Sequence, residues 1–413
     1  MEPRLDTSDP YASLRTRDFR WFVSARFALT IGIQMQSVIV GWQIYQITHD
    51  ALSLGLIGLS EALPFFGISL YAGHVADRTS RKSVILSSST VYFLCAAALL
   101  LISTKLEWIL HTHGIFPIYA IIFITGLARG FLTPSQSAFM AQLVPRELYG
   151  NASTWSSVSW QLADVTGPAF GGLIYGFSGV GAAYSAVVVM TLIGLISFTM
   201  VGRKPVPERK ARESIAQSLS GGLRFVFHDQ IILSAISLDM FAVFFGGAVA
   251  VLPIFADQVL HTGAKGLGFL RAAPAVGSVV MSVIQAHHPF FKRAGRNLLV
   301  CVFGFGLAIV SFSLSKNFYL SLIILIFSGM FDNVSVVIRN TIIQLHTPDE
   351  MRGRVAAVNG LFVGSSNELG AFESGVAAKL MGLVPSVVFG GTMALLVVGA
   401  VRKFAPKLRK LEL

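Results

Sequence analysis

The strongest constraint on this chain is a series of long apolar segments separated by short polar gaps. Most segments are long enough to cross a hydrocarbon core about 30 Å thick as α-helices of roughly 20 residues. Only 13% of the residues are charged, whereas a soluble protein has about 25%. We therefore predict an all-α polytopic membrane protein with twelve transmembrane helices. The expected spans are residues 20–47, 52–75, 83–104, 115–143, 150–177, 180–201, 229–259, 264–287, 297–315, 317–345, 355–380 and 385–404.

The basic residues predict how these spans are oriented. The net charge is +11, with 32 Lys and Arg residues. Of these, 24 lie in or at the border of the two terminal segments and the even-numbered gaps, and four lie in or at the border of the odd-numbered gaps. Because Lys and Arg concentrate in cytoplasmic loops, both termini are expected in the cytoplasm. The basic balance is therefore a topology signal, and no nucleic-acid partner is expected.

A polar stretch in the middle of the chain divides the spans into six and six. We expect an N-terminal six-helix bundle at residues 1–202, a cytoplasmic linker at 203–228 and a C-terminal six-helix bundle at 229–413. Residues 214–227 alternate polar and apolar side chains in a helix-like way. They predict a helix on the membrane surface, with an ordinary solvated linker as the alternative.

The two halves repeat each other in sequence. One offset of 203 residues superposes several glycine, proline and glutamate positions. Since each half has an even number of spans, both halves enter the membrane in the same orientation, and the working site is expected between them. The superposed pairs are Gly126 and Gly329, Pro145 and Pro348, Glu147 and Glu350, Gly150 and Gly353, and Gly167 and Gly370.

The second gap carries the sequence Gly-His-Val-Ala-Asp-Arg-Thr-Ser-Arg-Lys. It resembles the signature loop of the major facilitator superfamily, with every fixed position filled, and the resemblance extends over the whole chain. The resemblance implies a two-bundle transporter fold and a charged latch that breaks when the transporter turns inward. The alternative for these charges is topology alone. The expected latch residues are Gly73, Asp77, Arg78, Arg81, Lys82 and Glu147, with a weaker copy at Arg293, Arg296 and Glu350.

Two further motifs indicate a branch of this superfamily. Gly167-Pro168-Ala-Phe-Gly171-Gly172 resembles the antiporter motif, although helix packing alone is an alternative reason for these glycines. Residues 41–45, 367–370 and 373–375 resemble the twelve-span exporter branch that includes enterobactin-type siderophore exporters and macrolide efflux proteins.

Ionisable and polar residues inside the spans are the functional candidates, because a charge at membrane depth is costly and should face a cavity or a partner. Arg129 and Asp332 occupy equivalent positions in the repeat, which suggests an attraction across the cavity. The cavity and substrate candidates are Arg26, Thr30, Ser37, Arg129, Gln136, Arg339 and Glu373.

A proton-coupling carboxylate needs a pKa that burial raises and a nearby positive charge lowers. Asp239 and Glu368 stand apart from basic residues in their own spans. Our order of candidates is Asp239, Asp332, Glu368 and Glu61, with a structural ion pair as the alternative role for each.

These features predict a secondary transporter that exports an amphipathic siderophore or drug-like molecule by alternating access, in exchange for protons. An importer or uncoupled permease of the same fold is the alternative, and a polytopic membrane enzyme is a remote one. We expect no cofactor, no metal and no catalytic residue, with the proton gradient as energy source. A monomer in the lipid bilayer of the bacterial inner membrane is expected, with a small molecule as substrate.

Overall fold

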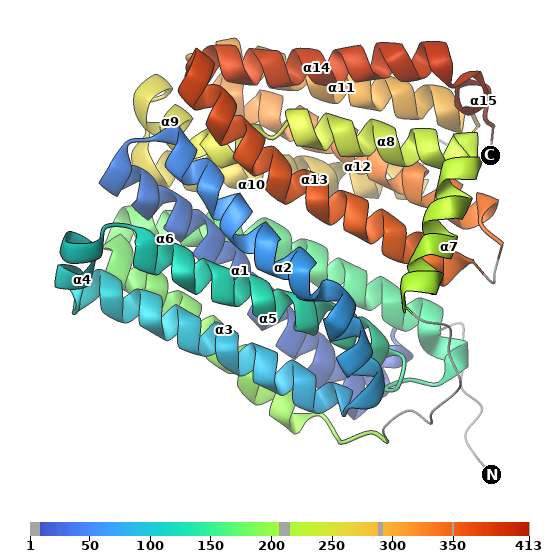
Figure 1. Ribbon diagram of the computed structural model, residues 1–413, viewed down its shortest axis with the longest axis horizontal. Helices are drawn as coiled ribbons and strands as arrows, with labels where there is room; N and C mark the ends of the chain where they lie inside the picture. Colours follow the sequence, from blue (N-terminus) through green and yellow to red (C-terminus); the bar gives the residue numbers. More distant parts are fainter. Residues whose placement is uncertain (1–8, 206–214, 288–291, 349–350, 413) are drawn as a thin grey trace. The chain divides into compact units, whose positions relative to one another are not determined.

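The computed structural model describes residues 9–205, 215–287, 292–348 and 351–412. Every regular element in these residues is a helix, so the predicted all-α fold is confirmed (Figure 1). The helices are α1 (Arg17–Thr48), α2 (Ala51–Arg78), α3 (Arg81–Thr104), α4 (Glu107–His113), α5 (Phe116–Met140), α6 (Tyr149–Met200), α7 (Ile215–His228), α8 (Gln230–Phe245), α9 (Leu252–Ile254), α10 (Gly263–His287), α11 (Ala294–Leu314), α12 (Phe318–His346), α13 (Arg352–Met381), α14 (Leu383–Phe404) and α15 (Pro406–Arg409).

Ten helical segments in the described residues are long and apolar enough to cross a membrane. One of them, α6, covers the fifth and sixth expected spans, and Gly179 interrupts its helical geometry with a φ of 81°. Glycine has no Cβ and adopts this conformation without strain. The helix α13 covers the eleventh expected span and is not among the ten. The count of twelve spans and the cytoplasmic position of the termini stay predictions.

The chain forms two compact units. The first comprises Met1–Gln43 and Ser60–Ala211, and the second comprises Ile44–Leu59 and Arg212–Leu413. The end of α1 and the start of α2 therefore belong with the second unit, whereas the sequence pattern predicted that they belong with the N-terminal bundle.

The core of the first unit is built from α1, α3, α5 and α6. Phe22 of α1 is fully buried, and its ring centroid lies 6.1 Å from those of Phe139 in α5 and Phe198 in α6. Apolar residues that recur on one side of each helix make this packing. The residues that precede α1 pack against the start of α6 in the same unit.

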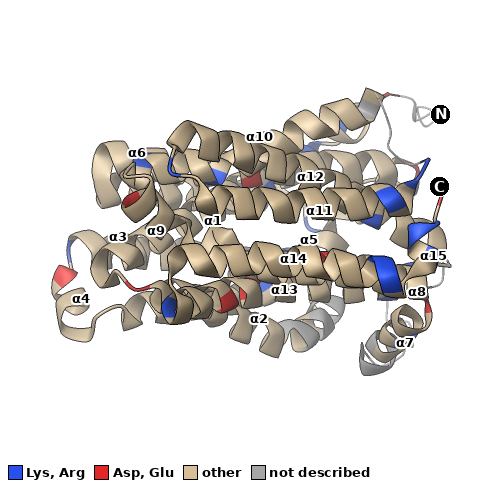
Figure 2. Cartoon of the chain, turned by 90° about the horizontal axis from the view of Figure 1, so that it is seen from above, with Lys and Arg blue, Asp and Glu red and all other residues tan. Residues whose placement is uncertain are grey.

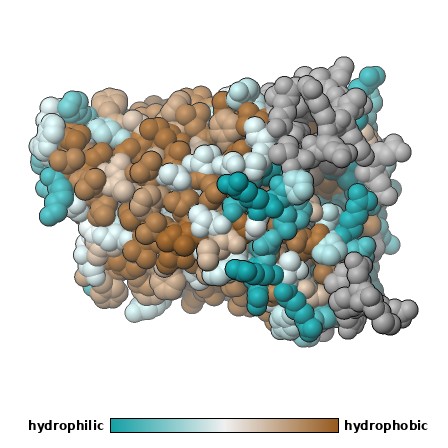
Figure 3. Space-filling view, turned by 90° about the horizontal axis from the view of Figure 1, so that it is seen from below, coloured by the Kyte–Doolittle hydropathy of each residue, from teal (hydrophilic) through white to brown (hydrophobic). Residues whose placement is uncertain are grey.

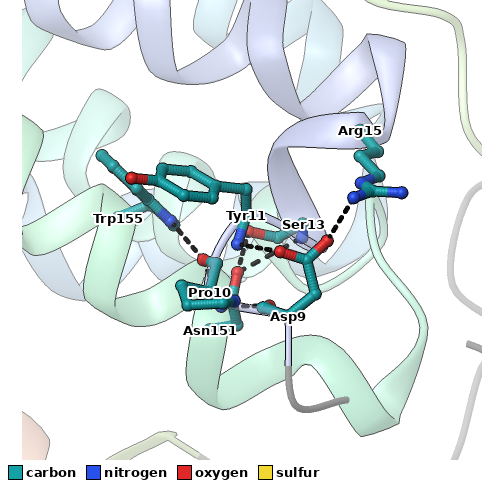
Figure 4. Close-up of polar contacts among 7 residues, drawn as sticks. All are labelled: Asp9, Pro10, Tyr11, Ser13, Arg15, Asn151 and Trp155. Carbon is teal, nitrogen blue, oxygen red and sulfur yellow. Dashed lines mark hydrogen bonds and ion pairs between the residues drawn. The ribbon is translucent and has the colours of Figure 1, made fainter. Parts of the chain in front are cut away.

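Figure 4 shows how these N-terminal residues are held. The side chain of Asn151 donates to the carbonyl of Pro10 at 2.7 Å, and the indole of Trp155 donates to the same carbonyl at 2.9 Å. The Tyr11 ring lies 5.6 Å from that of Trp155. The first turns of α6 are therefore tied to the chain just before α1.

The second unit packs α8, α11, α12 and α14 around Leu238, Leu298, Ile338 and Ala394. The amphipathic helix α7 packs on the same unit, because Val226 lies fully buried in a cluster with Ile236 of α8 and Val358 of α13. The predicted helix at residues 214–227 is therefore present as α7, and part of its apolar side packs on protein. Its position at the membrane surface stays a prediction.

The surface of the helices matches a bilayer environment. Apolar side chains cover most of the helical surface in the view of Figure 3. In the second unit, Lys and Arg residues gather at the end of α14 and in α15 (Figure 2). A chain with this surface is a multi-pass membrane protein.

Candidate functional site

The first unit contains an ion pair between two expected site residues. Arg129 of α5 donates through Nη1 to Glu61 Oε1 of α2 at 2.6 Å, and the two side chains are 34% and 26% exposed. The Arg129 guanidinium also lies 5.2 Å from the centroid of the Phe65 ring. We expected Arg129 to be attracted to Asp332. The structure instead pairs Arg129 with a carboxylate of its own unit, so its charge is compensated locally.

The second unit contains a more deeply buried pair. Arg339 of α12 forms an ion pair with Asp239 of α8, and each side chain is only 5% exposed. Asp239 stands apart from basic residues in its own span, but the structure supplies a basic partner from another helix, as in the alternative of a structural ion pair. A buried pair of this kind is costly to break, because the charge that remains has no water to solvate it.

Next to this pair lies a small cavity with a volume of about 10 Å³. Its polar lining consists of Asp239, Asp332 and Ser335, and its apolar lining comes from α8 and α11. Such a volume accommodates about one water molecule. Asp332 has no ion-pair partner among the described residues. Two carboxylates thus share one small polar cavity, and one of them is already paired.

The remaining acidic candidates lie on α13. Glu368 and Glu373 are both half-buried. The backbone carbonyl of Glu368 lies against Gly58 of α2, and the hydroxyl of Ser374 donates to the carbonyl of Gly247 at 3.1 Å. The first contact places α13 against the start of α2, and the second places it against the segment that follows α8, all within the second unit.

Polar residues form a strip along α1 and α6 of the first unit. Arg26 of α1 donates to the hydroxyl of Ser156, and the amide of Gln34 donates to Asp164. Both contacts join residues 130 positions apart in the sequence, so the two helices run parallel. The other candidates flank this strip or α5: Thr30 and Gln136 are half-buried and Ser37 is exposed.

The glycines of the antiporter-type motif explain how closely α1 and α6 approach. A Cβ at Gly167 would lie 2.6 Å from Cβ of Gln34, and a Cβ at Gly171 would lie 2.9 Å from the backbone of Met35. Side chains larger than hydrogen do not fit these positions without movement. Pro168 and Gly172 belong to the same stretch of α6. The motif therefore brings the two polar faces together.

The expected latch is described only in part. The side chains of Gly73, Asp77 and Arg78 and the whole of Glu350 lie outside the described residues. The guanidinium of Arg81 donates to the carbonyl of Ala138 at 2.7 Å, and Glu147 is exposed. The latch contacts therefore stay a prediction.

The other basic residues of the latch follow the same pattern. Lys82 donates to the carbonyls of Thr199 and Val201 at the end of α6, at 2.8 Å for Thr199. Arg293 and Arg296 are exposed. The backbone carbonyls at the C-terminal end of α6 attract Lys82 because the helix dipole makes that end negative.

Sequence reasoning missed a group of polar contacts around residues 44–59. The hydroxyl of Tyr45 donates to Asp257 at 2.7 Å, and Lys379 pairs with Asp50 at 2.8 Å. Burial opposes ionisation of Asp50, but hydrogen bonds from Lys379 and Ser53 outweigh it and lower the pKa of this carboxyl. The partners are far apart in the sequence, so no local sequence pattern predicts these contacts.

The internal repeat is visible in the packing of each unit. In the first unit a Cβ at Gly126 would meet the carbonyl of Glu61 at 2.5 Å and the ring of Pro64 at 2.7 Å. In the second unit a Cβ at Gly329 would meet the carbonyl of Pro274 at 1.7 Å. The equivalent glycines Gly126 and Gly329 therefore each pack on a proline of a neighbouring helix.

Solved structures with this arrangement are transporters of the major facilitator fold. A bacterial homologue of the human lysosomal transporter Spinster, solved in an inward-facing and unoccupied conformation, is similar with a TM-score of 0.73 and 15% sequence identity, over 97% of this chain and 99% of that chain. The xylose transporter XylE of E. coli in an inward-open conformation is similar with a TM-score of 0.71 and 12% identity, over 94% and 96% of the two chains. The predicted major facilitator fold is confirmed.

The sequence comparisons narrow this class to a family. A model of the transmembrane secretion effector family matches residues 8–413. Enterobactin exporters EntS of Shigella dysenteriae serotype 1 and Escherichia coli are 29% identical over 390 residues, which cover 92% of this chain and 90% of each relative. The chain belongs to the transmembrane secretion effector family of the major facilitator superfamily. It is a membrane transporter, and both its family and its fold are those of transporters rather than enzymes.

Proposed function

We propose that this transporter exports an amphipathic, siderophore-type molecule across the bacterial inner membrane and takes up protons in exchange. The relatives named enterobactin exporters support the direction and the substrate class. The motif at Gly167–Gly172 supports antiport, because it resembles the antiporter motif and brings α6 onto α1.

The observation that carries the proton coupling is the buried Asp239–Arg339 pair beside a cavity that also contains Asp332. A proton that binds to Asp239 removes its negative charge and releases Arg339. The freed guanidinium is then uncompensated at membrane depth, which costs several kcal/mol. The second unit must rearrange to compensate it, and this rearrangement is a way to couple protonation to alternating access.

Asp332 gives this mechanism a second proton acceptor. It lines the same cavity as Asp239, which has room for about one water molecule. A water molecule there can pass a proton between the two carboxylates, which share the cavity. While Asp239 is paired with Arg339, the exchangeable proton can stay on Asp332, and its transfer to Asp239 breaks the ion pair.

Transport into everted membrane vesicles tests this proposal. Vesicles with an acidic lumen should accumulate enterobactin, and a protonophore should abolish the accumulation. Asp239→Asn alone leaves Arg339 without its partner, so the double variant Asp239→Asn/Arg339→Gln is the better test of coupling. We expect the double variant to reach the membrane and to lose accumulation driven by the pH gradient.

A matched control comes from the first unit. Glu61→Gln/Arg129→Gln removes the other ion pair with the same chemistry, and it should retain more of the gradient-driven accumulation. Equal accumulation with and without a pH gradient would indicate an uncoupled permease. Normal gradient-driven accumulation in the Asp239→Asn/Arg339→Gln variant would remove Asp239 from the mechanism.

A further inference from the structure

Arg26 lies well inside the first helix of the first unit. It is nine residues from the start of α1 at Arg17, or about 14 Å along the helix axis. Its guanidinium donates to the hydroxyl of Ser156, which is buried in α6. A serine hydroxyl accepts a hydrogen bond but does not neutralise the positive charge.

Two other arginines inside the helices each have a carboxylate partner. Arg129 is paired with Glu61, and Arg339 is paired with Asp239. No carboxylate among the described residues pairs with Arg26. An uncompensated cation at this depth is costly and marks a functional site in membrane proteins. The cost falls when an anion binds, because a charge-assisted hydrogen bond replaces lost hydration.

The acid that lies nearest along the strip is engaged elsewhere. Asp164 is eight residues beyond Ser156 on α6, about 12 Å along the helix. Gln34 of α1 donates to Asp164. Gln34 lies eight residues beyond Arg26, just as Asp164 lies eight residues beyond Ser156. The strip therefore presents a positive end at Arg26 and a negative end at Asp164, and the positive end is available for a ligand of opposite charge.

An aromatic residue lies beside the positive end. Trp160 is one helical turn beyond Ser156, about 6 Å along α6, and it is 44% exposed. At 100° per residue, Ser153, Ser157, Trp160 and Asp164 fall on one face of α6. Hydroxyls, an indole ring and a nearby guanidinium on adjacent faces suit a ligand that carries an aromatic ring, hydroxyl groups and a negative charge.

We propose that Arg26 is a specificity-determining residue that binds the anionic group of an aromatic, hydroxylated substrate, with Trp160 packing beside the ring. This assignment rests on the proposed export of siderophore-type molecules. It also names the chemical group of the substrate that the first unit binds, which is a carboxylate or catecholate oxygen next to an aromatic ring.

Binding of two probes that differ by one carboxylate group tests the assignment. The probes are 2,3-dihydroxybenzoate and catechol, and isothermal calorimetry measures their affinity for the purified full-length protein in phosphatidylcholine nanodiscs. We expect Arg26→Gln to weaken binding of 2,3-dihydroxybenzoate about ten-fold or more, since hydrogen bonds to charged groups have this strength. Catechol binding should change less than about two-fold, and Arg26→Lys should restore part of the difference.

The matched control is Arg402→Gln, which removes one positive charge in the last turn of α14 and leaves the first unit intact. It should bind both probes like the wild type. Retained catechol affinity shows that the Arg26→Gln protein is folded, and Trp160→Ala should weaken both probes together because it removes the ring contact.

Several outcomes would overturn the assignment. One is equal affinity of the wild type and Arg26→Gln for 2,3-dihydroxybenzoate, and another is a wild type that binds neither probe. A lipid phosphate as the true ligand would appear as stabilisation by phosphatidylglycerol that Arg26→Gln abolishes, with probe affinity unchanged, and this result also overturns the assignment. Enterobactin accumulation in vesicles is measured separately, so the export proposal can stand or fall independently.

Discussion

At the scale of single residues, the pairing of buried charges decides which groups are available for function. Asp239 and Arg339 compensate each other, as do Glu61 and Arg129, whereas Arg26 is bonded to a hydroxyl. The sequence could be used to name all five as membrane-depth charges, because charges are rare in apolar spans. It could not be used to pair them, since each partner lies on another helix.

The buried pair in the second unit should show its cost in stability measurements. Asp239→Asn leaves Arg339 unpaired at 5% exposure and should destabilise the protein by about 3–5 kcal/mol. The double variant Asp239→Asn/Arg339→Gln should be more stable than Asp239→Asn, because it buries no isolated charge. Thermal unfolding of the purified proteins in one detergent measures the difference. A double variant that is less stable than the single variant would contradict the pairing.

A pH effect is expected from Asp50. The pKa of Asp50 lies below its ordinary value of 3.8, so the Asp50–Lys379 pair contributes its full stability above that value. The contribution is lost as the pH falls through the lowered pKa. Since the side chains are 29% and 52% exposed, Asp50→Asn should cost only about 0.2–1 kcal/mol at neutral pH.

Unfolding curves recorded from neutral to acidic pH check this sign. The stability difference between the wild type and Asp50→Asn should shrink toward zero in acid. Lys379→Gln is the partner control and should give a similar loss at neutral pH. A difference that grows in acid would show that Asp50 is not the group responsible.

At the scale of helices, the closest contact that positions the site is that of α6 with α1. The sequence motif indicated where glycines allow close packing, and the structure identifies Met35 and Gln34 of α1 as what they pack against. The amphipathic pattern of residues 214–227 also predicted the helix α7, but not that Val226 of α7 packs with residues of α8 and α13. An amphipathic pattern indicates that one face is buried, but it does not say whether lipid or protein buries it.

The α6–α1 contact is testable with two alanine substitutions in one helix. Gly171→Ala forces a Cβ to within 2.9 Å of the Met35 backbone and should destabilise the protein by about 1–3 kcal/mol. Gly150→Ala is the matched control, because nothing lies within 4 Å of its Cβ and alanine favours a helix. Thermal unfolding should show a loss for the first and no loss for the second. Equal losses would mean that α6 does not depend on this close approach.

At the scale of the whole molecule, the repeat of the two halves was predicted from spaced glycines and prolines. Its physical basis is now clear, because Gly126 packs on Pro64 and Gly329 packs on Pro274. The charged residues inside the helices differ between the two halves, although the glycine–proline packing is the same. The first unit carries Glu61 and Arg129 as a pair, and the second carries Asp332 beside the Asp239–Arg339 pair. Our two proposals follow this asymmetry, since they assign proton binding to the second unit and substrate selection to the first.

The most direct test of the account is the movement of protons when substrate is transported. A pH-sensitive dye in the lumen of everted vesicles with an acidic interior should report alkalinisation when enterobactin is added to wild-type vesicles. Vesicles with the Asp239→Asn/Arg339→Gln variant should show no alkalinisation above the background of empty vesicles. Enterobactin accumulation without any substrate-dependent pH change in wild-type vesicles would contradict proton-coupled export.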